Sequence, residues 1–307
     1  MKRGVLWAVL SSLCFGASGP FGKALIGAGF SPLQAAWLRI AGAALILLPL
    51  ALAMRGPRGF SAARPHAGRV VAYGLTGVVG CQALFFVAAS RLPVGIASLL
   101  EFTGPVVLLL WVGVVRRAPV RRGAAAGIAV AVVGLACVVE VWSGLSLDAI
   151  GLAAGLGSAA CQAAYFLLVE GMTGQVDPLV MTAGGMVVGA PVLAVVAAPW
   201  NAPWHVLGDT VAFGTGTAPA WALALWVIVV STVVAYVTGC WAVQLLDAQP
   251  AAAIGYTEAV AATVIAWVVL GEHLTAFQVA GGVVVLSGAY IAQRSVEPRP
   301  SPVPVAA

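Results

Sequence analysis

Two glutamates in otherwise apolar stretches are the residues of this chain best placed to do chemistry. Glu101 is the only charged residue in "GIASLLEFTGPVVLLLWVGVV", residues 95–115, and Glu258 lies in "GYTEAVAATVIAWVV", residues 255–269. A charge at the centre of a spanning helix costs about 2.5–3.5 kcal/mol on insertion scales, so it normally faces the bundle interior or a water-filled cavity. Such a carboxylate either binds a substrate amine or a proton, or serves the structure alone, and both interpretations stay open.

Two further residues bear on Glu101. Pro105 lies four residues after it and removes one helix hydrogen bond, which predicts a kink beside Gly104. Arg39, in "AAWLRIAGAALIL", is an intramembrane cation at about the same predicted depth as Glu101. We expect Arg39 to be structural, as the ion-pair partner of Glu101 or as a side chain that reaches towards the interface.

Polar and aromatic residues recur on single faces of several other predicted helices, at spacings of three and four residues. Together they predict a substrate pathway lined by groups from several helices. Besides the two glutamates, the predicted lining residues are Ser11, Gln82, Gln162, Tyr165, Tyr236 and Trp241. Each of them alone is equally well explained by hydrogen bonding between packed helices.

The composition predicts what positions these residues. The chain has 307 residues, of which 62% are hydrophobic and only 8% are charged, and its mean hydropathy is +1.04. Soluble domains carry about 25% charged residues, and about 20 apolar residues cross a bilayer, so we expect an all-α integral membrane protein with ten transmembrane helices. The predicted spans are residues 4–22, 32–53, 69–90, 94–115, 122–141, 147–170, 178–198, 221–243, 250–271 and 275–293.

The cations predict the orientation of these spans. Most of the 15 lysines and arginines fall in the connections on the same side as the N-terminus. Because cytoplasmic connections are enriched in Lys and Arg, we expect a multi-pass protein of the cytoplasmic membrane with both termini in the cytoplasm. The net charge of +5 therefore reflects topology, and we expect no nucleic-acid partner.

Several other chemistries find no support in the sequence. The five cysteines lack CxxC spacing and the three histidines lie outside the spans, so we expect no metal site. No GxxxxGK[ST] motif is present, which argues against an ATP-driven engine. We expect no cofactor and no catalytic residue, and the oligomeric state stays open.

The chain resembles itself at an offset of 154 residues. "RLPVGIASLLEFTGPVVLLLWVGVV" then falls on "LLDAQPAAAIGYTEAVAATVIAWVV", with Phe102-Thr103 on Tyr256-Thr257 and Gly127 on Gly281. Five spans per half is an odd number, so the halves would cross the membrane in opposite senses, an organisation typical of secondary transporters. We expect a first repeat over residues 1–141, a second over 142–294, and a disordered cytoplasmic tail over 295–307.

These features resemble the EamA-type family of the drug/metabolite transporter superfamily. The segments that carry the resemblance are "AAWLRIAGAALIL", "ASLLEFTGPVVLLL" and "GYTEAVAATVIAWVVLGEHLTAFQVAGGVVVLSGAYIAQR". The resemblance implies two fused five-helix halves and a small-molecule substrate. It also implies a non-enzymatic secondary transporter, exporting amino acids or related amines and drugs by alternating access. Proton coupling through Glu101 or Glu258 is a hypothesis that the positions of these residues add.

Two alternatives remain beside that reading. A passive facilitator would use the same cavity, and only accumulation against a gradient distinguishes it from an active transporter. A membrane-embedded enzyme acting on lipids would need clustered Asp, His or Asn near one leaflet, and the sequence offers no DxxxD pair.

Overall fold

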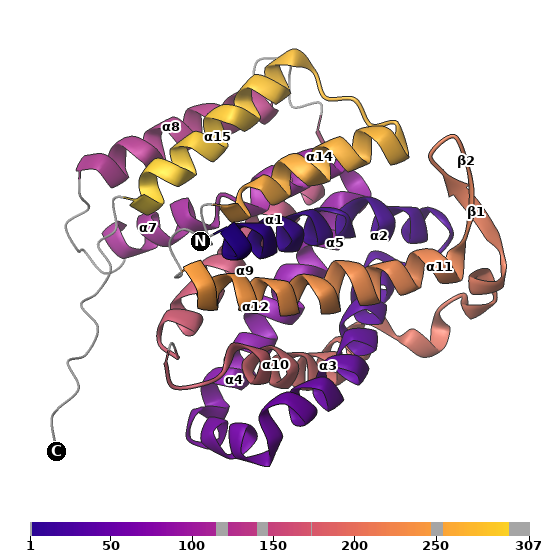
Figure 1. The fold of residues 1–307 in the computed structure, drawn as a ribbon. Helices are drawn as coiled ribbons and strands as arrows, with labels where there is room; N and C mark the ends of the chain where they lie inside the picture. The colour runs from indigo at the N-terminus through magenta and orange to yellow at the C-terminus, as the bar shows by residue number, and fades with distance from the viewer. Residues whose placement is uncertain (1, 115–121, 140–146, 173, 247–253, 295–307) are drawn as a thin grey trace, which may run out of the picture.

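The computed structural model describes residues 2–114, 122–139, 147–172, 174–246 and 254–294, which are mostly helical (Figure 1). The helices before residue 140 are α1 (Lys2–Gly16), α2 (Ser18–Gly27), α3 (Pro32–Ala63), α4 (Ala67–Tyr73), α5 (Cys81–Arg91), α6 (Val94–Glu101), α7 (Gly104–Val114) and α8 (Arg122–Val139). Those after it are α9 (Ala149–Glu170), α10 (Pro178–Ala197), α11 (Ala220–Leu225), α12 (Ala235–Leu246), α14 (Thr257–Leu270) and α15 (Ala276–Arg294). Short 3₁₀ turns cover Arg64–His66, Pro199–Asn201 and Trp204–Gly208.

The chain is a multi-pass membrane protein. Six of the described helical stretches are long and apolar enough to cross a bilayer, and three shorter apolar helices accompany them. The six are Lys2–Gly27, Pro32–Arg91, Val94–Trp111, Ala149–Val169, Pro178–Ala197 and Ala220–Ala242. The three are Arg122–Val138, Thr257–Leu270 and Ala276–Ala292.

The stretch Pro32–Arg91 is too long for one crossing. Its 60 residues would extend about 90 Å as a single helix, against a hydrocarbon thickness of about 30 Å. Gly56 breaks it with φ 64° and ψ −179°, a conformation that glycine adopts without strain, and Pro57 follows directly. The chain turns at this point, and α3 and α5 pack side by side.

The fold is mostly helical, as predicted, with one small exception. The connection between the predicted spans 178–198 and 221–243 contains a two-stranded antiparallel hairpin of β1 (Thr210–Phe213) and β2 (Gly216–Pro219). The turn between the strands contains Gly214 at φ 64°, and its N–H donates to the Val269 carbonyl at the end of α14. We call the end of the bundle that carries this hairpin, opposite to Lys2, the distal end (Figure 1).

Irregular helix geometry recurs at the 154-residue offset. A π-helical segment η2 (Gly74–Gly80) precedes α5, and its counterpart by offset lies within a second π-helical segment, η6 (Trp226–Val234), which precedes α12. The break at Phe102–Thr103 between α6 and α7 corresponds to the turn at Tyr256 directly before α14. π-Helical segments are rare in proteins and frequently lie at functional sites.

Helices α8 and α15 pack against each other through glycines (Figure 1). A methyl group on Gly134 would lie 2.5 Å from the Val285 nitrogen and 2.8 Å from the Gly281 oxygen. Gly281 meets the backbone of α8 equally closely, with the Gly134 oxygen at 2.8 Å. Small residues of this kind let membrane helices approach to backbone contact.

Some sequence predictions fall outside the described residues. These are the boundary between the two repeats at 141/142 and the tail over 295–307. Within the described residues, the second predicted span, 32–53, belongs to a helix that continues past Gly56 to Ala63, because Pro57 opens another helical turn.

We expect Gly134→Ala to lower the free energy of unfolding by about 1–3 kcal/mol, the usual cost of overpacking, because α8 and α15 must separate. Thermal unfolding in detergent measures this. Gly68→Ala is the matched control, since nothing lies within 4 Å of the added methyl group. Equal stability of the two variants would contradict close packing of α8 on α15.

Candidate functional site

A small polar cavity lies in the middle of the bundle. It encloses about 30 Å³, room for about two water molecules. Its lining comes from α1, α2, α3, α5, α6 and α14, and consists of Phe15, Gly16, Ser18, Arg39, Gln82, Phe85, Ser98, Glu101, Glu258 and Ala262. Both glutamates singled out from the sequence line it, together with Arg39 and Gln82.

Arg39 holds the cavity wall together. Its side chain on α3 is 2% exposed and donates three hydrogen bonds: from Nε to Thr232 Oγ1 at 2.7 Å, from Nη1 to Gln82 Oε1 at 2.5 Å, and from Nη2 to the Ser231 carbonyl at 3.0 Å. Thr232 Oγ1 in turn donates to the Val227 carbonyl, five residues back in the π-helical segment η6. One guanidinium therefore ties α3 to α5 and to η6.

Arg39 does not form the predicted ion pair with Glu101 in this structure. The ion pairs within 4 Å among the described residues are Lys23–Glu272, Arg55–Asp177 and Arg91–Asp148, and Arg39 belongs to none of them. The physical reason is that neutral oxygens already accept its donors, one each from Thr232, Gln82 and Ser231. An arginine has five N–H donors, so these three hydrogen bonds leave two for other partners at the cavity.

Glu101 is the last residue of α6 and lies directly before the break at Phe102–Thr103. It accepts a hydrogen bond from the Cys81 thiol, with 2.8 Å between Sγ and Oε1. Cys81 also lies 3.5 Å from the Ser158 hydroxyl of α9. Pro105, the residue predicted to kink this helix, is the second residue of α7, and the helix ends before it rather than bending through it.

Glu258 enters the cavity from the first turn of α14. The helix begins only at Thr257, after the turn at Tyr256, so the carboxylate lies near a helix N-terminus inside the bundle. Gly16 of α1 packs against this turn, since an added methyl group would lie 2.9 Å from the Glu258 carbonyl oxygen. The absence of a side chain at Gly16 therefore lets α1 and α14 approach closely beside the cavity.

The other predicted lining residues lie outside the cavity lining in this structure. Tyr236 packs its ring edge-to-face on the lining residue Phe15, with 4.8 Å between centroids. Ser11 donates to the Ala235 carbonyl at 2.8 Å, and Trp241 packs on Trp7 with 5.0 Å between centroids, so both join α1 to α12.

Two residues of α9 complete this comparison. Tyr165 packs on Tyr73 with ring centroids 5.5 Å apart. Gln162 approaches Gly104, and its oxygen is buried without a hydrogen-bond partner among the described residues. Both side chains pack α9 against neighbouring helices.

Sequence reasoning missed Ser98, Phe85 and the contact of Cys81 with Glu101. Ser98 lies one helical turn before Glu101, so its place on the same face of α6 could have indicated it. Phe85 and Cys81 are ordinary packing residues by type, and no signal in the sequence distinguishes them. The described residues hold no cluster of His, Cys, Asp or Glu that could bind a metal ion.

We expect Arg39→Gln to lower the free energy of unfolding by about 3 kcal/mol, because the truncated side chain leaves buried acceptors on α5 and η6 without donors. Thermal unfolding in detergent checks this, with Arg58→Gln, an exposed arginine of the same helix, as the control. If both variants unfold at the same temperature, Arg39 does not hold these helices together.

Comparisons with known proteins agree with the fold. The chain matches "Threonine/homoserine exporter RhtA" of two Salmonella typhimurium strains, SL1344 and LT2, with 30% identity over 213 residues. The match covers 67% of this chain and 64% of the length of those relatives. A solved structure, titled "Crystal structure of protein", aligns with a TM-score of 0.58 and 17% identity over 95% of this chain and 96% of that one, and shows the fold alone.

The family assignment rests on both parts of the chain. The EamA-like transporter family matches residues 2–140 and again residues 149–293, so two copies of one family unit follow each other. Members of that family are transporters rather than enzymes. This chain belongs to the EamA-like transporter family.

Proposed function

We propose that this protein is a secondary exporter of small amines, amino acids among them, that works by alternating access. The observation that carries the proposal is the central cavity, in which Glu101, Glu258 and Arg39 face one another from different helices. The relatives named as threonine/homoserine exporters support export of a molecule with an ammonium group.

The proposal includes the finer topology. Ten spans form two inverted five-helix halves, residues 1–141 and 142–294, in the cytoplasmic membrane with both termini in the cytoplasm. Support comes from features that recur at the 154-residue offset: the π-helical segments η2 and η6, and the breaks before α7 and before α14. Glycines that match at this offset, such as Gly134 and Gly288, also lie at the α8–α15 contact.

Charge balance in the cavity favours an ammonium group or a proton as the occupant. Arg39 supplies one positive charge, whereas Glu101 and Glu258 together supply two negative charges when both are ionised. One excess negative charge buried away from water is costly until a cation or a proton neutralises it. A substrate ammonium group and a proton therefore compete for the same carboxylates, which gives antiport of substrate against protons.

The size of the cavity favours alternating access over an open pore. About 30 Å³ is far smaller than the roughly 300–1,000 Å³ of typical small-molecule pockets. The helices must separate on one side to admit an amino acid, and on the other to release it. The breaks at Phe102–Thr103 and Tyr256 lie beside the two glutamates and are natural places for such movement.

The test is transport into proteoliposomes of labelled threonine, homoserine and a cationic dye, with and without an imposed pH gradient. We expect the native protein to accumulate substrate when the gradient is present. Glu101→Gln and Glu258→Gln keep the side-chain size and a hydrogen-bond acceptor but remove the charge. We expect each to reduce gradient-driven accumulation about tenfold or more.

Asp209→Asn is the matched control, because Asp209 is an exposed carboxylate beside the hairpin, outside the cavity. Substrate exchange without a gradient separates the roles. A variant that exchanges substrate but no longer accumulates it has lost coupling, whereas one that does neither has lost binding. Equilibration without accumulation by the native protein would identify a passive facilitator and contradict active export.

A further inference from the structure

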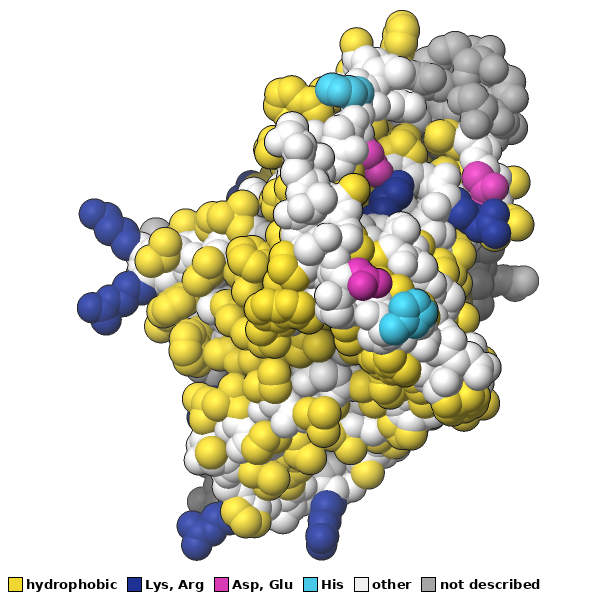
Figure 2. Space-filling model, turned by 90° about the vertical axis from the view of Figure 1, so that its right-hand side faces the viewer, with side chains coloured by type: hydrophobic (Ala, Val, Ile, Leu, Met, Phe, Trp, Pro, Cys, Tyr) yellow, Lys and Arg dark blue, Asp and Glu magenta, His cyan; other side chains and the backbone are white. Residues whose placement is uncertain are grey.

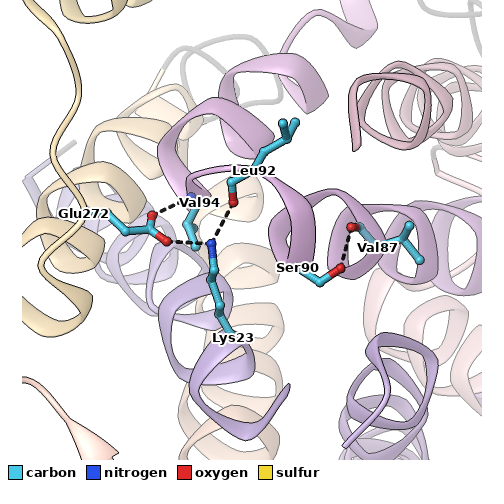
Figure 3. Close-up of polar contacts among 6 residues, drawn as sticks. All are labelled: Lys23, Val87, Ser90, Leu92, Val94 and Glu272. Carbon is cyan, nitrogen blue, oxygen red and sulfur yellow. Dashed lines mark hydrogen bonds and ion pairs between the residues drawn. The ribbon is translucent and has the colours of Figure 1, made fainter. Parts of the chain in front are cut away.

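A lysine and a glutamate from distant parts of the chain meet at the distal end (Figure 3). Lys23 Nζ of α2 lies 2.6 Å from Glu272 Oε1 in the connection between α14 and α15. Lys23 also donates to the Leu92 carbonyl at 2.7 Å, and Glu272 Oε2 accepts from the Val94 backbone N–H at 2.7 Å. A single ion pair therefore joins helix α2, the connection between α5 and α6, and the connection between α14 and α15.

Each charge has the sign that the neighbouring helix end favours. Leu92 is the residue directly after α5, so Lys23 binds a carbonyl at the negative end of that helix. Val94 is the first residue of α6, so Glu272 binds an N–H at the positive end of the next helix. The two helix ends thus fix which position carries the positive charge and which the negative charge. An ion pair on an open surface has no such preference.

The pair is shielded but not sealed from water. The Lys23 and Glu272 side chains are 26% and 16% exposed, against 42% and 38% for Arg91 and Asp148. Figure 2, which faces the distal end, shows side chains of opposite charge close together in the upper part of this face. Such a partly buried contact can form and break as water enters and leaves.

Helix α6 connects this ion pair to the central cavity. It begins at Val94, which Glu272 holds, and ends seven residues later at Glu101, which lines the cavity. Every residue from Val94 to Leu100 is buried, so the helix is held on all sides along its length of about 12 Å. A shift of its N-terminus would therefore be transmitted to Glu101.

We propose that Lys23 and Glu272 are positioning residues for Glu101: their ion pair closes the distal end by holding the start of α6, and its rupture opens the cavity to that side. The inference rests on the proposed function in one respect, that the cavity is the transport site. Arg55 and Asp177, 2.8 Å apart, join α3 to the start of α10 in a separate ion pair.

The test uses the thiol of Cys81, which contacts Glu101 and is buried. In a variant that keeps Cys81 and replaces the other four cysteines by alanine, a membrane-impermeant methanethiosulfonate is applied from either side of the membrane. We expect Glu272→Ala and Lys23→Met to raise the rate of Cys81 labelling from the distal side about tenfold, a population shift typical of one lost contact. Labelling from the opposite side should fall, because the opened state is closed there.

Two outcomes would overturn the proposal. Unchanged labelling in a folded Glu272→Ala variant would mean that the ion pair does not close the distal end. Faster labelling from both sides would mean general loosening rather than opening on one side. Glu272→Gln, which keeps the side-chain size, replaces Glu272→Ala if that variant fails to fold. Arg91→Gln, which breaks the exposed pair with Asp148 at the same end, is the matched control and should label like the native protein.

The double variant Lys23→Glu with Glu272→Lys tests the role of the helix ends. An isolated ion pair would be restored by the exchange of charges. Here the exchange sets a carboxylate against the Leu92 carbonyl and an ammonium group against the Val94 N–H, so we expect fast labelling to persist. Labelling restored to the native rate would contradict the part assigned to α6.

These measurements need no substrate, so they fail or succeed independently of the proposed function. Opening on one side in the Glu272→Ala variant, without transport of any amine by the native protein, would uphold the positioning role and reject the exporter. Gradient-driven transport by the native protein, together with Cys81 labelling of the variants at the native rate, would uphold the exporter and reject the positioning role.

Discussion

The need to satisfy a buried guanidinium away from water is the constraint on which the rest of this bundle depends. Arg39 meets it with three hydrogen bonds, to a side chain of α5 and to two groups of the π-helical segment η6. Because both segments must approach α3 at the same depth, polar groups gather there and a small cavity remains between the helices. The two glutamates complete that cavity and, when both are ionised, leave it with one negative charge in excess of Arg39.

The same helices that carry these charges are interrupted beside them. Glu101 ends α6 at a break, and Glu258 begins α14 just after a turn, so neither carboxylate lies in the middle of a continuous helix. Short helices can tilt as units while the surrounding packing stays intact. The ion pair of Lys23 with Glu272 lies at the far end of α6 and joins the movement of this helix to the closure of the distal end.

Charge in an apolar context was the signal that sequence analysis used best. One cavity is lined by all four of Glu101, Glu258, Arg39 and Gln82, since a polar side chain inside a membrane normally contacts other polar groups or water. The placement of Ser11 and Trp241 could not be predicted, because helical periodicity gives the face of a helix but not the neighbour it meets. The partnership of Lys23 and Glu272 was missed for a similar reason: both lie at helix ends, where charges are common.

The measurement that tests the central claim most directly is proton release when substrate binds. Threonine or a simple amine is added to purified protein in weakly buffered detergent solution, and a pH indicator follows the protons. If the ammonium group and a proton compete for Glu101 and Glu258, about one proton leaves per substrate bound, and the double variant Glu101→Gln with Glu258→Gln releases none. Substrate binding without proton release, or equal release by that variant, would contradict the account.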